Sequence, residues 1–441
     1  MDSARSSKIC VIGGGLMGMA LARKLARDSH AVTVLEREKQ LGGLATYHDF
    51  GGFYWDRFYH VILPSDRHLI KFVDDLGLTD KLEWRRTYTG FYVNENLYSI
   101  SSNREFLKFP LLSLISKMRL AWTMIYCSRI NDWQRLERMT VEDWLIKVSG
   151  LKTYEKLWQP LLLAKLGQNY KRVSAVFIWS YIKRLYSARD RSASAEHLGH
   201  VSGGYKMIFE RLYQDIIRAK GAVQTGVTVS QVTPEDQGGL NVLIDGQYHK
   251  FDRVVCTSPV SILQRIVAQE LLRVERQGGE VEYLGVVCVV VVSRKPLVPF
   301  YVVNIADDSI PFTGMIGMST VVSTKNTAGR YLTYLPKYIL STDDELERSD
   351  DEVQQAFMEG VRKILPDFNM ELIESVHVNR AFKVQPLQVL GYSELVPQVV
   401  TNHPGLFVLN TSQFVNATLN NNEVIGAVNR FYEAHRDALA C

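Results

Sequence analysis

The sequence contains few cysteines, and their distribution excludes two kinds of protein. Only five of its 441 residues are cysteine, they lie far apart, and none belongs to a CxxC pair. A disulfide-stapled domain and a zinc site built on cysteine pairs are therefore excluded. Cys10, Cys256 and Cys288 fall in apolar runs typical of buried strands, so we expect small buried thiols. Free thiols indicate a reducing compartment, and we predict a cytoplasmic location.

Long hydrophobic runs are also missing. The longest aliphatic run, Leu284 to Val292, is too short to span a bilayer and is predicted to form a central strand. The apolar run at residues 9–12 is too short for a signal peptide and leads directly into glycines. With 46% hydrophobic and 22% charged residues, the composition is that of a globular protein and excludes a disordered or collagen-like chain. A length of 441 residues suits two or three domains that share an interface.

The chain as a whole has no large excess of either charge, but one segment has a clear excess of positive charge. Lys+Arg total 51 and Asp+Glu total 47, so the net charge of +4 gives no reason to expect nucleic acid as a partner. Residues 104–138 contain seven basic and three acidic residues, a surplus equal to the net charge of the whole chain. Their apolar neighbours predict a basic amphipathic helix, which can lie peripherally on the anionic inner face of a membrane. A helix packed on its own domain with a solvated basic face is the alternative, and the sequence leaves both open.

The chain opens with a strand, a glycine-rich turn and a helix. Residues 8–12 are predicted to form a buried strand, residues 16–26 a helix, and residues 31–35 a second strand. This βαβ unit predicts a parallel sheet and an α/β fold. Five of the seven tryptophans fall in the helical stretch that follows, and we expect them to form a core; they are Trp122, Trp133, Trp144, Trp158 and Trp179.

The turn matches the dinucleotide-binding motif GxGxxG, since it reads Gly13-Gly14-Gly15-Leu16-Met17-Gly18. Gly13 permits the tight turn, Gly15 lets a pyrophosphate approach the backbone, and Gly18 lets the helix pack on the sheet. The free amides and the positive dipole end of the helix then face the phosphates. Glu36 ends the second strand and can accept hydrogen bonds from ribose hydroxyls, which favours an unphosphorylated adenosine ribose.

The residues after Glu36 distinguish FAD from NAD by resemblance. An acidic strand end, a short spacer and the pair Gly42-Gly43 resemble the flavoprotein branch of amine oxidases, protoporphyrinogen oxidase, phytoene desaturases and UDP-galactopyranose mutase. These families share a two-domain FAD fold, so the resemblance implies a Rossmann-like, three-layer FAD-binding domain. It assigns cofactor contacts in this part of the chain to Gly13, Gly15, Leu16, Met17, Gly18, Glu36, Arg37, Gly42, Gly43, Leu44 and Ala45.

The resemblance continues at four separate later segments. Residues 201–205 resemble the second entry into the FAD domain, and residues 226–229 resemble the strand whose valine, here Val229, brackets the adenine. Residues 254–259, with Thr257, resemble the strand that returns beneath the cofactor, and residues 405–409 resemble the last strand before the flavin-binding helix.

The sequence departs from these relatives after the last strand. Many of them have Gly-Asp there, and the aspartate binds the ribityl chain; this chain has Asn410-Thr411, which can hydrogen-bond but supply no carboxylate. Downstream, Asn422 is predicted to cap a helix that begins near Glu423 and Val424, and whose N-terminus faces the flavin pyrimidine ring. The flavin-linking cysteine motif of some amine oxidases is absent, so FAD is expected to bind noncovalently.

Three residues are candidates for the chemistry. By resemblance to the mutase branch, His60 is predicted to lie against the isoalloxazine, with Tyr59 beside it; a hydrogen-bonded structural histidine is the alternative. Lys165 lies in a strongly apolar stretch, where burial would lower its pKa and allow it to act as a base; a snorkelling surface lysine is the alternative. No cluster of histidine, cysteine and acidic residues has metal-ligand spacing, so no metal site is predicted.

The predicted domains are discontinuous in sequence. The FAD-binding domain comprises residues 1–82, 201–262 and 379–441. An α+β substrate domain comprises residues 83–103 and 263–378, and residues 104–200 form a helical insertion.

The resemblance implies an FAD-dependent oxidoreductase in which flavin N5 takes a hydride from a bulky small molecule, lipid-linked or sugar-linked. Two alternatives stay open. One is a non-redox flavoenzyme resembling UDP-galactopyranose mutase, for which Arg172 and Arg184 are candidate diphosphate ligands. The other is a binding protein that kept the fold without catalysis, an alternative motivated by Asn410-Thr411.

Overall fold

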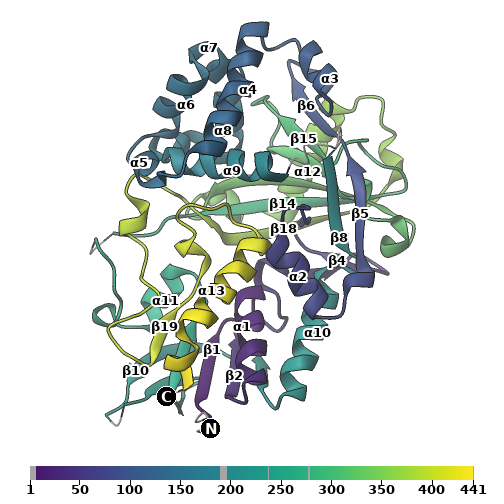
Figure 1. Ribbon diagram of the computed structural model, residues 1–441. Coiled ribbons are helices and arrows are strands. Elements are labelled where there is room, and N and C mark those ends of the chain that lie inside the picture. Colours follow the sequence, from purple (N-terminus) through teal and green to yellow (C-terminus); the bar gives the residue numbers. More distant parts are fainter. Residues whose placement is uncertain (1–5, 189–195, 237, 277–278, 441) are drawn as a thin grey trace.

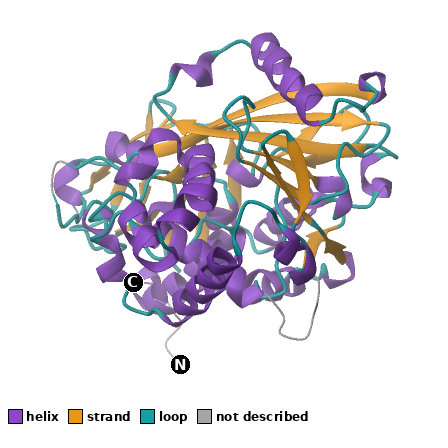
Figure 2. Cartoon of the chain, turned by 90° about the horizontal axis from the view of Figure 1, so that it is seen from above, coloured by secondary structure: helices purple, strands orange, loops and turns teal. Residues whose placement is uncertain are grey.

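The computed structural model describes residues 6–188, 196–236, 238–276 and 279–440. Both chain ends lie at one end of the molecule beside a parallel sheet, and a helical block lies at the other end (Figure 1). A long, mainly antiparallel sheet crosses between them. Figure 2, a view from above, shows most of the helices gathered on one side of the strands.

The parallel sheet has five strands in the order β19-β13-β1-β2-β9, and every neighbouring pair is parallel. This arrangement confirms the predicted βαβ opening and the α/β class. The strands are β1 (Lys8–Ile12), β2 (Ala31–Glu36), β9 (Ala222–Thr225), β13 (Arg253–Cys256) and β19 (Leu406–Val408).

Each face of this sheet is covered by a different layer, which confirms the predicted three-layer domain. Apolar side chains of four helices form one core with β1 and β2. A second core lies on the opposite face, against a three-stranded antiparallel sheet and α11 (Val260–Ile266). The helices are α1 (Leu16–Arg27), α2 (Arg67–Asp75), α10 (Gly204–Arg218) and α13 (Asn421–Ala440); the small sheet contains β10 (Val229–Pro234), β11 (Leu240–Ile244) and β12 (Gln247–Phe251).

The long sheet contains the aliphatic run that was predicted as a central strand. This run lies in β14, every residue of which is buried. Alternate side chains point to opposite faces, so Val289 packs towards α12 (Asp350–Ile364) and Cys288 towards Trp55. The strands, in sheet order, are β18 (Ile373–Pro386), β14 (Tyr283–Ser293), β17 (Tyr331–Leu340), β16 (Gly314–Gly317), β15 (Val302–Ile305), β6 (Thr89–Val93) and β7 (Asn96–Ser99).

The helical block has a core of its own, which includes buried Trp144, Trp158 and Trp179. The prediction that all five tryptophans form a core is wrong for Trp122, which is 59% exposed. Its helix turns a polar side inward, where the Thr123 hydroxyl lies 3.0 Å from the Ser149 hydroxyl. The helices are α3 (Asn103–Lys108), α4 (Leu114–Arg129), α5 (Trp133–Glu137), α6 (Val141–Ser149), α7 (Leu151–Thr153), α8 (Gln159–Leu166) and α9 (Ala175–Ala188), with a π-helical turn at Tyr154–Trp158.

Two short strand pairs connect these parts. One is the hairpin β3 (Tyr47–Asp49) and β4 (Tyr54–Asp56), and the other joins β5 (Leu82–Thr87) to β8 (Glu196–Val201). The four described cysteines are buried free thiols, as expected for Cys10, Cys256 and Cys288, whereas Cys441 lies outside the described residues. The predicted domain boundaries stay predictions, although β18 belongs to the long sheet on both sides of residue 379.

Candidate functional site

Turns from separate parts of the chain meet at the carboxyl edge of the parallel sheet. Gly13 follows β1, Thr257 follows β13, and Asn410 lies just after β19, while Glu36 is the last residue of β2. The Thr257 hydroxyl donates a 2.9 Å hydrogen bond to the Ile12 carbonyl, which joins two of these turns. Ligands of open parallel sheets bind at this edge, so the fold brings the predicted cofactor residues to a suitable place.

Three glycines of the motif differ in what explains the absence of a side chain at their position. Gly13 has φ +115°, which few other residues adopt, and a β-carbon at Gly18 would clash with the Gly13 carbonyl. Gly15 has φ −73° and ψ 177°, which any residue can adopt. The nearest atom to a β-carbon at Gly15 would be the Gly42 carbonyl oxygen at 4.0 Å, so the fold has room for a β-carbon there. Neither backbone nor packing requires glycine at this position, and the missing side chain leaves space for a ligand to approach the backbone.

The N-terminus of α1 is open to an anion. No side chain caps this helix, so the first amides, at Leu16, Met17 and Gly18, point towards the turn. The second glycine pair faces them, because the Gly42 amide donates a 3.0 Å hydrogen bond to the Gly14 carbonyl. Free amides together with the helix dipole favour a phosphate at this point. Next to this pair lies the short 3-10 turn Gly43–Ala45, in which Leu44 is half-buried and Ala45 is buried.

Glu36 is fixed against the glycine turn. Its two carboxylate oxygens accept hydrogen bonds from the amides of Gly14 at 2.7 Å and Glu38 at 2.9 Å. A carboxylate has about four acceptor positions, so two remain for ribose hydroxyls. The side chain of Arg37 is 67% exposed and pairs with Glu38, which puts it at the rim of the site.

The predicted adenine contact, Val229, begins β10 and pairs with Ile244. Val227 lies closer to the end of β2, because its amide donates a 3.1 Å hydrogen bond to the Glu36 carbonyl. The assignment to Val229 stays a prediction, and the geometry makes Val227 a second candidate from the same segment.

Sequence reasoning missed two basic residues near this edge, Lys383 and Arg265, which lie near the predicted cofactor residue Arg37. Lys383, on β18, contacts the Ser261 hydroxyl. Burial lowers the pKa of Lys383, and so does the positive charge of Arg265 and Arg37 nearby. The three cations lie close enough to influence one another, although Arg37 is also paired with Glu38. The three residues are far apart in sequence, so no local pattern signals this group.

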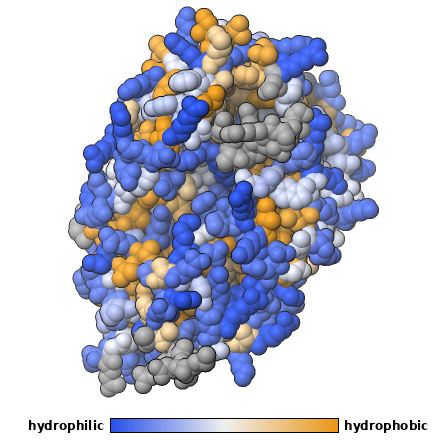
Figure 3. All heavy atoms as spheres, in the orientation of Figure 1, coloured by the Kyte–Doolittle hydropathy of each residue, from blue (hydrophilic) through white to orange (hydrophobic). Residues whose placement is uncertain are grey.

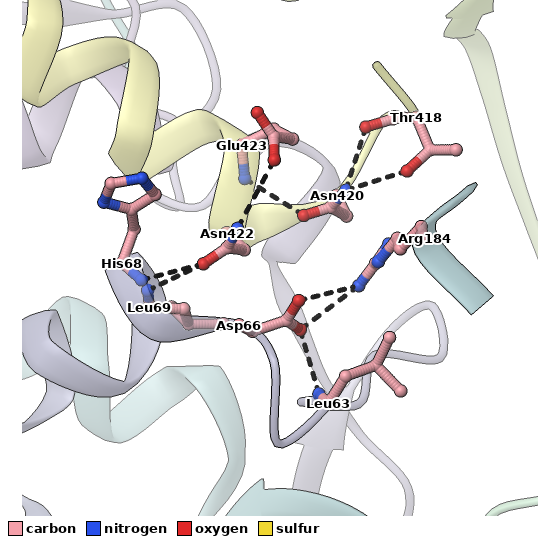
Figure 4. Close-up of polar contacts among 9 residues, drawn as sticks. All are labelled: Leu63, Asp66, His68, Leu69, Arg184, Thr418, Asn420, Asn422 and Glu423. Carbon is pink, nitrogen blue, oxygen red and sulfur yellow. Dashed lines mark hydrogen bonds and ion pairs between the residues drawn. The ribbon is translucent and has the colours of Figure 1, made fainter. Parts of the chain in front are cut away.

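The other end of the candidate site is formed by the N-terminus of α13 (Figure 4). The prediction that Asn422 caps this helix is wrong, because the Asn420 side chain accepts the Glu423 amide at 3.0 Å. Asn422 is already inside the helix, and its side chain instead accepts the amides of His68 and Leu69 at the start of α2. The polar run Asn420 to Glu423 therefore serves two helix starts, and Val424 is buried behind it.

An ion pair joins the helical block to this region (Figure 4). Arg184 of α9 donates to the carboxylate of Asp66 at 3.1 Å, and the same carboxylate accepts the Leu63 amide at 2.9 Å. Arg172, on the surface, forms a bidentate pair with Glu282 at 2.6 Å. Both arginines predicted as candidate diphosphate ligands are thus engaged with carboxylates.

His60 and Tyr205 lie together near the start of α13. Their ring centroids are 5.1 Å apart, and the Tyr205 phenol lies beside the Asn421 side chain. Among the described residues, Nδ1 of His60 and the hydroxyl of Tyr205 are buried without a well-formed hydrogen bond. Burial lowers the pKa of His60 to about 4, although the Phe58 carbonyl acts against it, so the imidazole is neutral at pH 7. Buried polar atoms normally have partners, and a polar ligand would supply them here.

Tyr59 and Lys165 are brought together by aromatic neighbours. The Tyr59 hydroxyl lies 2.7 Å from the Tyr338 hydroxyl, and the Lys165 ammonium lies 4.3 Å from the ring centroid of Tyr181 and 5.3 Å from that of Tyr338. The expectation of a lowered pKa for Lys165 is wrong. Burial alone would lower it, but the phenol groups of Tyr181 and Tyr338 outweigh burial and the pKa is raised. Lys165 is therefore a half-buried group whose charged ammonium form is favoured near neutral pH.

Asn410 has a structural explanation. Its side chain donates to the Ser258 carbonyl at 3.1 Å and accepts the Ser412 amide at 3.1 Å, so it joins the turns after β13 and β19. Thr411 is half-buried, and its hydroxyl makes no hydrogen bond within the described residues. Of the two residues that replace Gly-Asp, Thr411 is the one whose side chain is available to a ligand.

The hydrogen-bonding groups and the open positions along this edge of the sheet fit an FAD molecule. The adenosine end has Glu36, the diphosphate has the amides at α1 and the space beside Gly15, and the flavin end has His60, Tyr205 and the start of α13.

Comparison with known proteins agrees with this geometry. A family model described as flavin-containing amine oxidoreductase matches residues 16–408. Over 42 residues the chain is 52% identical to flavin-containing monooxygenase FMO GS-OX2 of Arabidopsis thaliana, a match that covers 10% of this chain and 9% of the relative. It is 27% identical over 135 residues to the mitochondrial protoporphyrinogen oxidase of Nicotiana tabacum, covering 29% and 27% respectively. The chain thus matches only a minor part of these relatives' lengths.

Solved structures resemble the chain over its full length. A protoporphyrinogen oxidase-like protein of Exiguobacterium sp. 255-15 has a TM-score of 0.75 at 17% identity, covering 97% of this chain and 98% of that one. Putrescine oxidase bound to putrescine has a TM-score of 0.72 at 16% identity, covering 99% of each chain. Reduced UDP-galactopyranose mutase has a TM-score of 0.71 at 14% identity, covering 97% and 95%. At these identities the likeness is one of fold.

Proposed function

Since the chain belongs to the flavin-containing amine oxidoreductase family, we propose that it binds FAD noncovalently and oxidises a bulky, uncharged or anionic small molecule. The observation that carries the FAD proposal is Gly15. Its backbone is ordinary and its surroundings are open, so the glycine is explained by a ligand that approaches the backbone. The adjacent uncapped start of α1 supplies donors for the diphosphate of such a ligand.

Bound flavin supplies a hydride acceptor, so the protein itself need not provide a strong base. The role of its side chains is to bind, orient and exclude water. Neutral His60 and the Tyr205 hydroxyl offer hydrogen bonds at a buried position beside the start of α13. The positive end of that helix favours negative charge in the same place.

The aromatic group around Lys165 supports the substrate class. A charged ammonium already lies against the rings of Tyr181 and Tyr338. A cationic amine entering here would meet like charge in a low-dielectric setting, which is unfavourable, whereas a carboxylate or hydroxyl would gain a partner. Tyr59 and Tyr338 add two hydroxyl groups to otherwise apolar surroundings. We therefore favour a partly apolar substrate with an oxygen acceptor over a simple amine.

A non-redox reaction on a nucleotide sugar is the second candidate, favoured by the position of His60 next to the start of α13 and by the likeness to the mutase fold. Against it, Arg172 and Arg184 are each paired with a carboxylate and are less able to hold a second diphosphate. Turnover of UDP-galactopyranose by the dithionite-reduced protein without net oxidation would favour this candidate over the oxidoreductase.

The first experiment is the absorption spectrum of the purified protein, followed by release of the cofactor with heat and its identification by mass. We expect a yellow protein that releases intact FAD. A colourless protein that takes up no added FAD would contradict the proposal and favour a binding protein that kept only the fold.

The substrate class is tested on the flavin-loaded protein with two probes of similar size. Benzoate is expected to perturb the flavin spectrum, and benzylamine is expected neither to perturb nor to reduce it. Lys165→Met should weaken benzoate binding about tenfold, whereas Lys156→Met, an exposed lysine in the same helical block, should leave it unchanged. Anaerobic reduction of the flavin by benzylamine would contradict the proposed substrate class without affecting the FAD assignment.

A further inference from the structure

Helix α4 has the reverse of the usual amphipathic arrangement. Its buried residues are Ser116, Lys117, Thr123 and Cys127. Its exposed face carries large apolar side chains that are 41% to 65% exposed, namely Leu114, Ile115, Met118, Trp122 and Tyr126. Four of these recur at every fourth position, which places them along one side of the helix. A surface helix normally turns such a stripe inward, so this face is built to be covered by something else.

Hydrogen bonds hold the polar side of α4 against the rest of the helical block. The exposure of the apolar side is therefore not the result of a helix in the wrong rotation. The buried Lys117 ammonium donates a 2.7 Å hydrogen bond to the Leu107 carbonyl, and the Thr123 hydroxyl bonds the Arg119 carbonyl and the Ser149 hydroxyl. Ser113 caps the start of the helix by accepting the Ser116 amide. Turning the apolar stripe inward would break the hydrogen bonds from Lys117 to Leu107 and from Thr123 to Ser149.

Neighbouring helices extend the apolar face. Leu107 at the end of α3 is 60% exposed and Leu151 in α7 is 53% exposed. The Lys117 bond to Leu107 holds α3 against α4, and Arg119 packs against Gly150 next to α7. We call the seven side chains together the apolar tip; they are Leu107, Leu114, Ile115, Met118, Trp122, Tyr126 and Leu151. Figure 3 shows apolar side chains at the end of the molecule where Figure 1 labels α4 and α7, far from the chain ends.

Exposed positive charge predominates in the stretch of chain that carries the apolar tip. Between residues 104 and 156 the exposed acidic residues are Asp132, Asp143 and Glu155. The exposed basic residues of the same stretch are three times as many: Arg104, Lys108, Arg119, Arg129, Arg135, Arg138, Lys147, Lys152 and Lys156. Two of them, Lys108 and Lys152, directly follow the exposed Leu107 and Leu151. Apolar side chains with a basic surround match a surface of acyl chains beneath anionic headgroups.

We propose that the apolar tip docks the protein on an anionic membrane surface. The helix α4 lies in the plane of the headgroups, with Met118 and Trp122 reaching the acyl boundary and the basic residues contacting lipid phosphates. In the part of the chain that the structure describes, every helix falls short of the length or hydrophobicity needed to span a bilayer. The proposal is independent of the flavin chemistry.

Vesicle co-sedimentation tests the proposal on the flavin-loaded protein. We expect the protein to pellet with vesicles that contain phosphatidylglycerol, and to remain in the supernatant with phosphatidylcholine alone. The double variant Met118→Glu with Trp122→Glu should lower the partition coefficient at least tenfold, since two apolar anchors are replaced by charges. Tyr248→Glu is the matched control, because Tyr248 is 60% exposed on β12 in the parallel-sheet domain and its replacement should leave binding unchanged.

The charge contribution is measured separately. Lys108→Glu with Lys152→Glu should reduce binding to the anionic vesicles at least about tenfold, and added salt should weaken wild-type binding. All substituted side chains are exposed, and an unchanged flavin spectrum checks that each variant is folded. A brominated acyl chain should quench part of the tryptophan emission of the wild type but not of Trp122→Phe.

Three results would overturn the proposal. One is the absence of wild-type binding to anionic vesicles. The second is binding that survives the double variant. The third is a concentration-dependent dimer, seen by sedimentation velocity, that the double variant abolishes while vesicles capture none of the protein; the tip would then be an interface between two copies of this chain.

Discussion

The two ends of the candidate site differ in the groups that form them, which are main-chain groups at one end and side chains at the other. At the diphosphate end, main-chain amides and glycines of one continuous segment form the contacts, with Gly15 beside the uncapped start of α1. At the other end, partly or fully buried side chains from distant segments meet, with His60 against Tyr205 and Lys165 against Tyr338. A site made of backbone depends on local sequence, whereas a site made of side chains depends on how the whole chain folds. The difference explains why one end can be recognised from sequence and the other cannot.

The largest expected effect breaks the diphosphate end alone. Gly15→Val should weaken FAD binding by at least about 100-fold, or about 3 kcal/mol, because the side chain fills the space left for the ligand. Its backbone conformation suits valine, so the thermal unfolding temperature of the apoprotein should change little. Flavin content after dialysis measures the first effect and calorimetry of the apoprotein the second.

Two controls sharpen this result. Gly18→Ala should lose stability because its β-carbon meets the Gly13 carbonyl, so it damages the fold as well as the cofactor site. Gly246→Ala, at a turn with φ +83° and open surroundings, should cost about 1 kcal/mol of stability but keep FAD. If Gly15→Val instead retained FAD, the proposed position of the diphosphate would be wrong.

The next largest effect is a pH dependence of stability, caused by His60 at the end of the site that is formed by side chains. The pKa of His60 is lowered to about 4 in the folded protein, from about 6.5 when unfolded. Below pH 6.5 the unfolded chain therefore binds the extra proton first, and stability falls as the pH drops towards 4. Between pH 7 and pH 5 this costs the wild type about 2 kcal/mol, at 1.36 kcal/mol for each pH unit below 6.5.

Denaturant titrations at the two pH values check this prediction. In His60→Gln the loss of stability between pH 7 and pH 5 should be smaller than in the wild type by about that amount. His249→Gln, at an exposed position on β12, should behave as the wild type does. Equal losses in His60→Gln and the wild type would show that His60 is not held neutral by burial.

The third prediction returns to the backbone end. Glu36→Gln keeps the size of the side chain but removes its charge, which weakens the hydrogen bonds from Gly14 and Glu38 as well as those to ribose hydroxyls. We expect about tenfold weaker FAD binding, or about 1.4 kcal/mol, measured by titrating the apoprotein with FAD. An unchanged affinity would place the ribose away from Glu36.

The smallest effect separates a half-buried tyrosine hydrogen bond from an exposed one. Tyr338→Phe removes the hydrogen bond to Tyr59 in a half-buried group and should lower the free energy of unfolding by about 1 kcal/mol. Tyr248→Phe removes a 3.0 Å bond to Gln231 on the exposed face of the small sheet and should cost little, because water replaces the partner. Equal losses in the two variants would show that partial burial gives the Tyr59–Tyr338 hydrogen bond no advantage over the exposed one.

The sequence-based predictions succeeded where a residue type has one local explanation. The strand, turn and helix around Gly13 follow from alternation, glycine and helix periodicity within a few residues, and the structure confirms them. The prediction for Asn422 failed by two positions, because three asparagines in succession all suit a helix cap and only the fold decides that Asn420 has this role. Lys165 failed for another reason, since its pKa depends on Tyr181 and Tyr338, which lie in other elements.

Trp122 illustrates a third kind of failure. A tryptophan among other apolar residues in a helical stretch is usually buried, and nothing in the local pattern says which side of α4 faces the core. The deciding interactions are polar ones, from Thr123 and Lys117 to neighbouring helices. Helical periodicity identifies the two faces of a helix. It does not show which face points towards the core when the residues of both faces can make favourable contacts.

The ion pair between Asp66 and Arg184 has a consequence for how the molecule unfolds. Together with Asn422, it ties the helical insertion, the early helix α2 and the C-terminal helix α13 at a single point (Figure 4). A ligand that binds only the native form stabilises everything held in the same cooperative unit, by an amount that grows with its concentration relative to its dissociation constant. Loading with cofactor should therefore raise the melting temperature of the distant helical block as well as that of the parallel-sheet domain. Loss of cofactor, in turn, should expose the helical block to proteolysis.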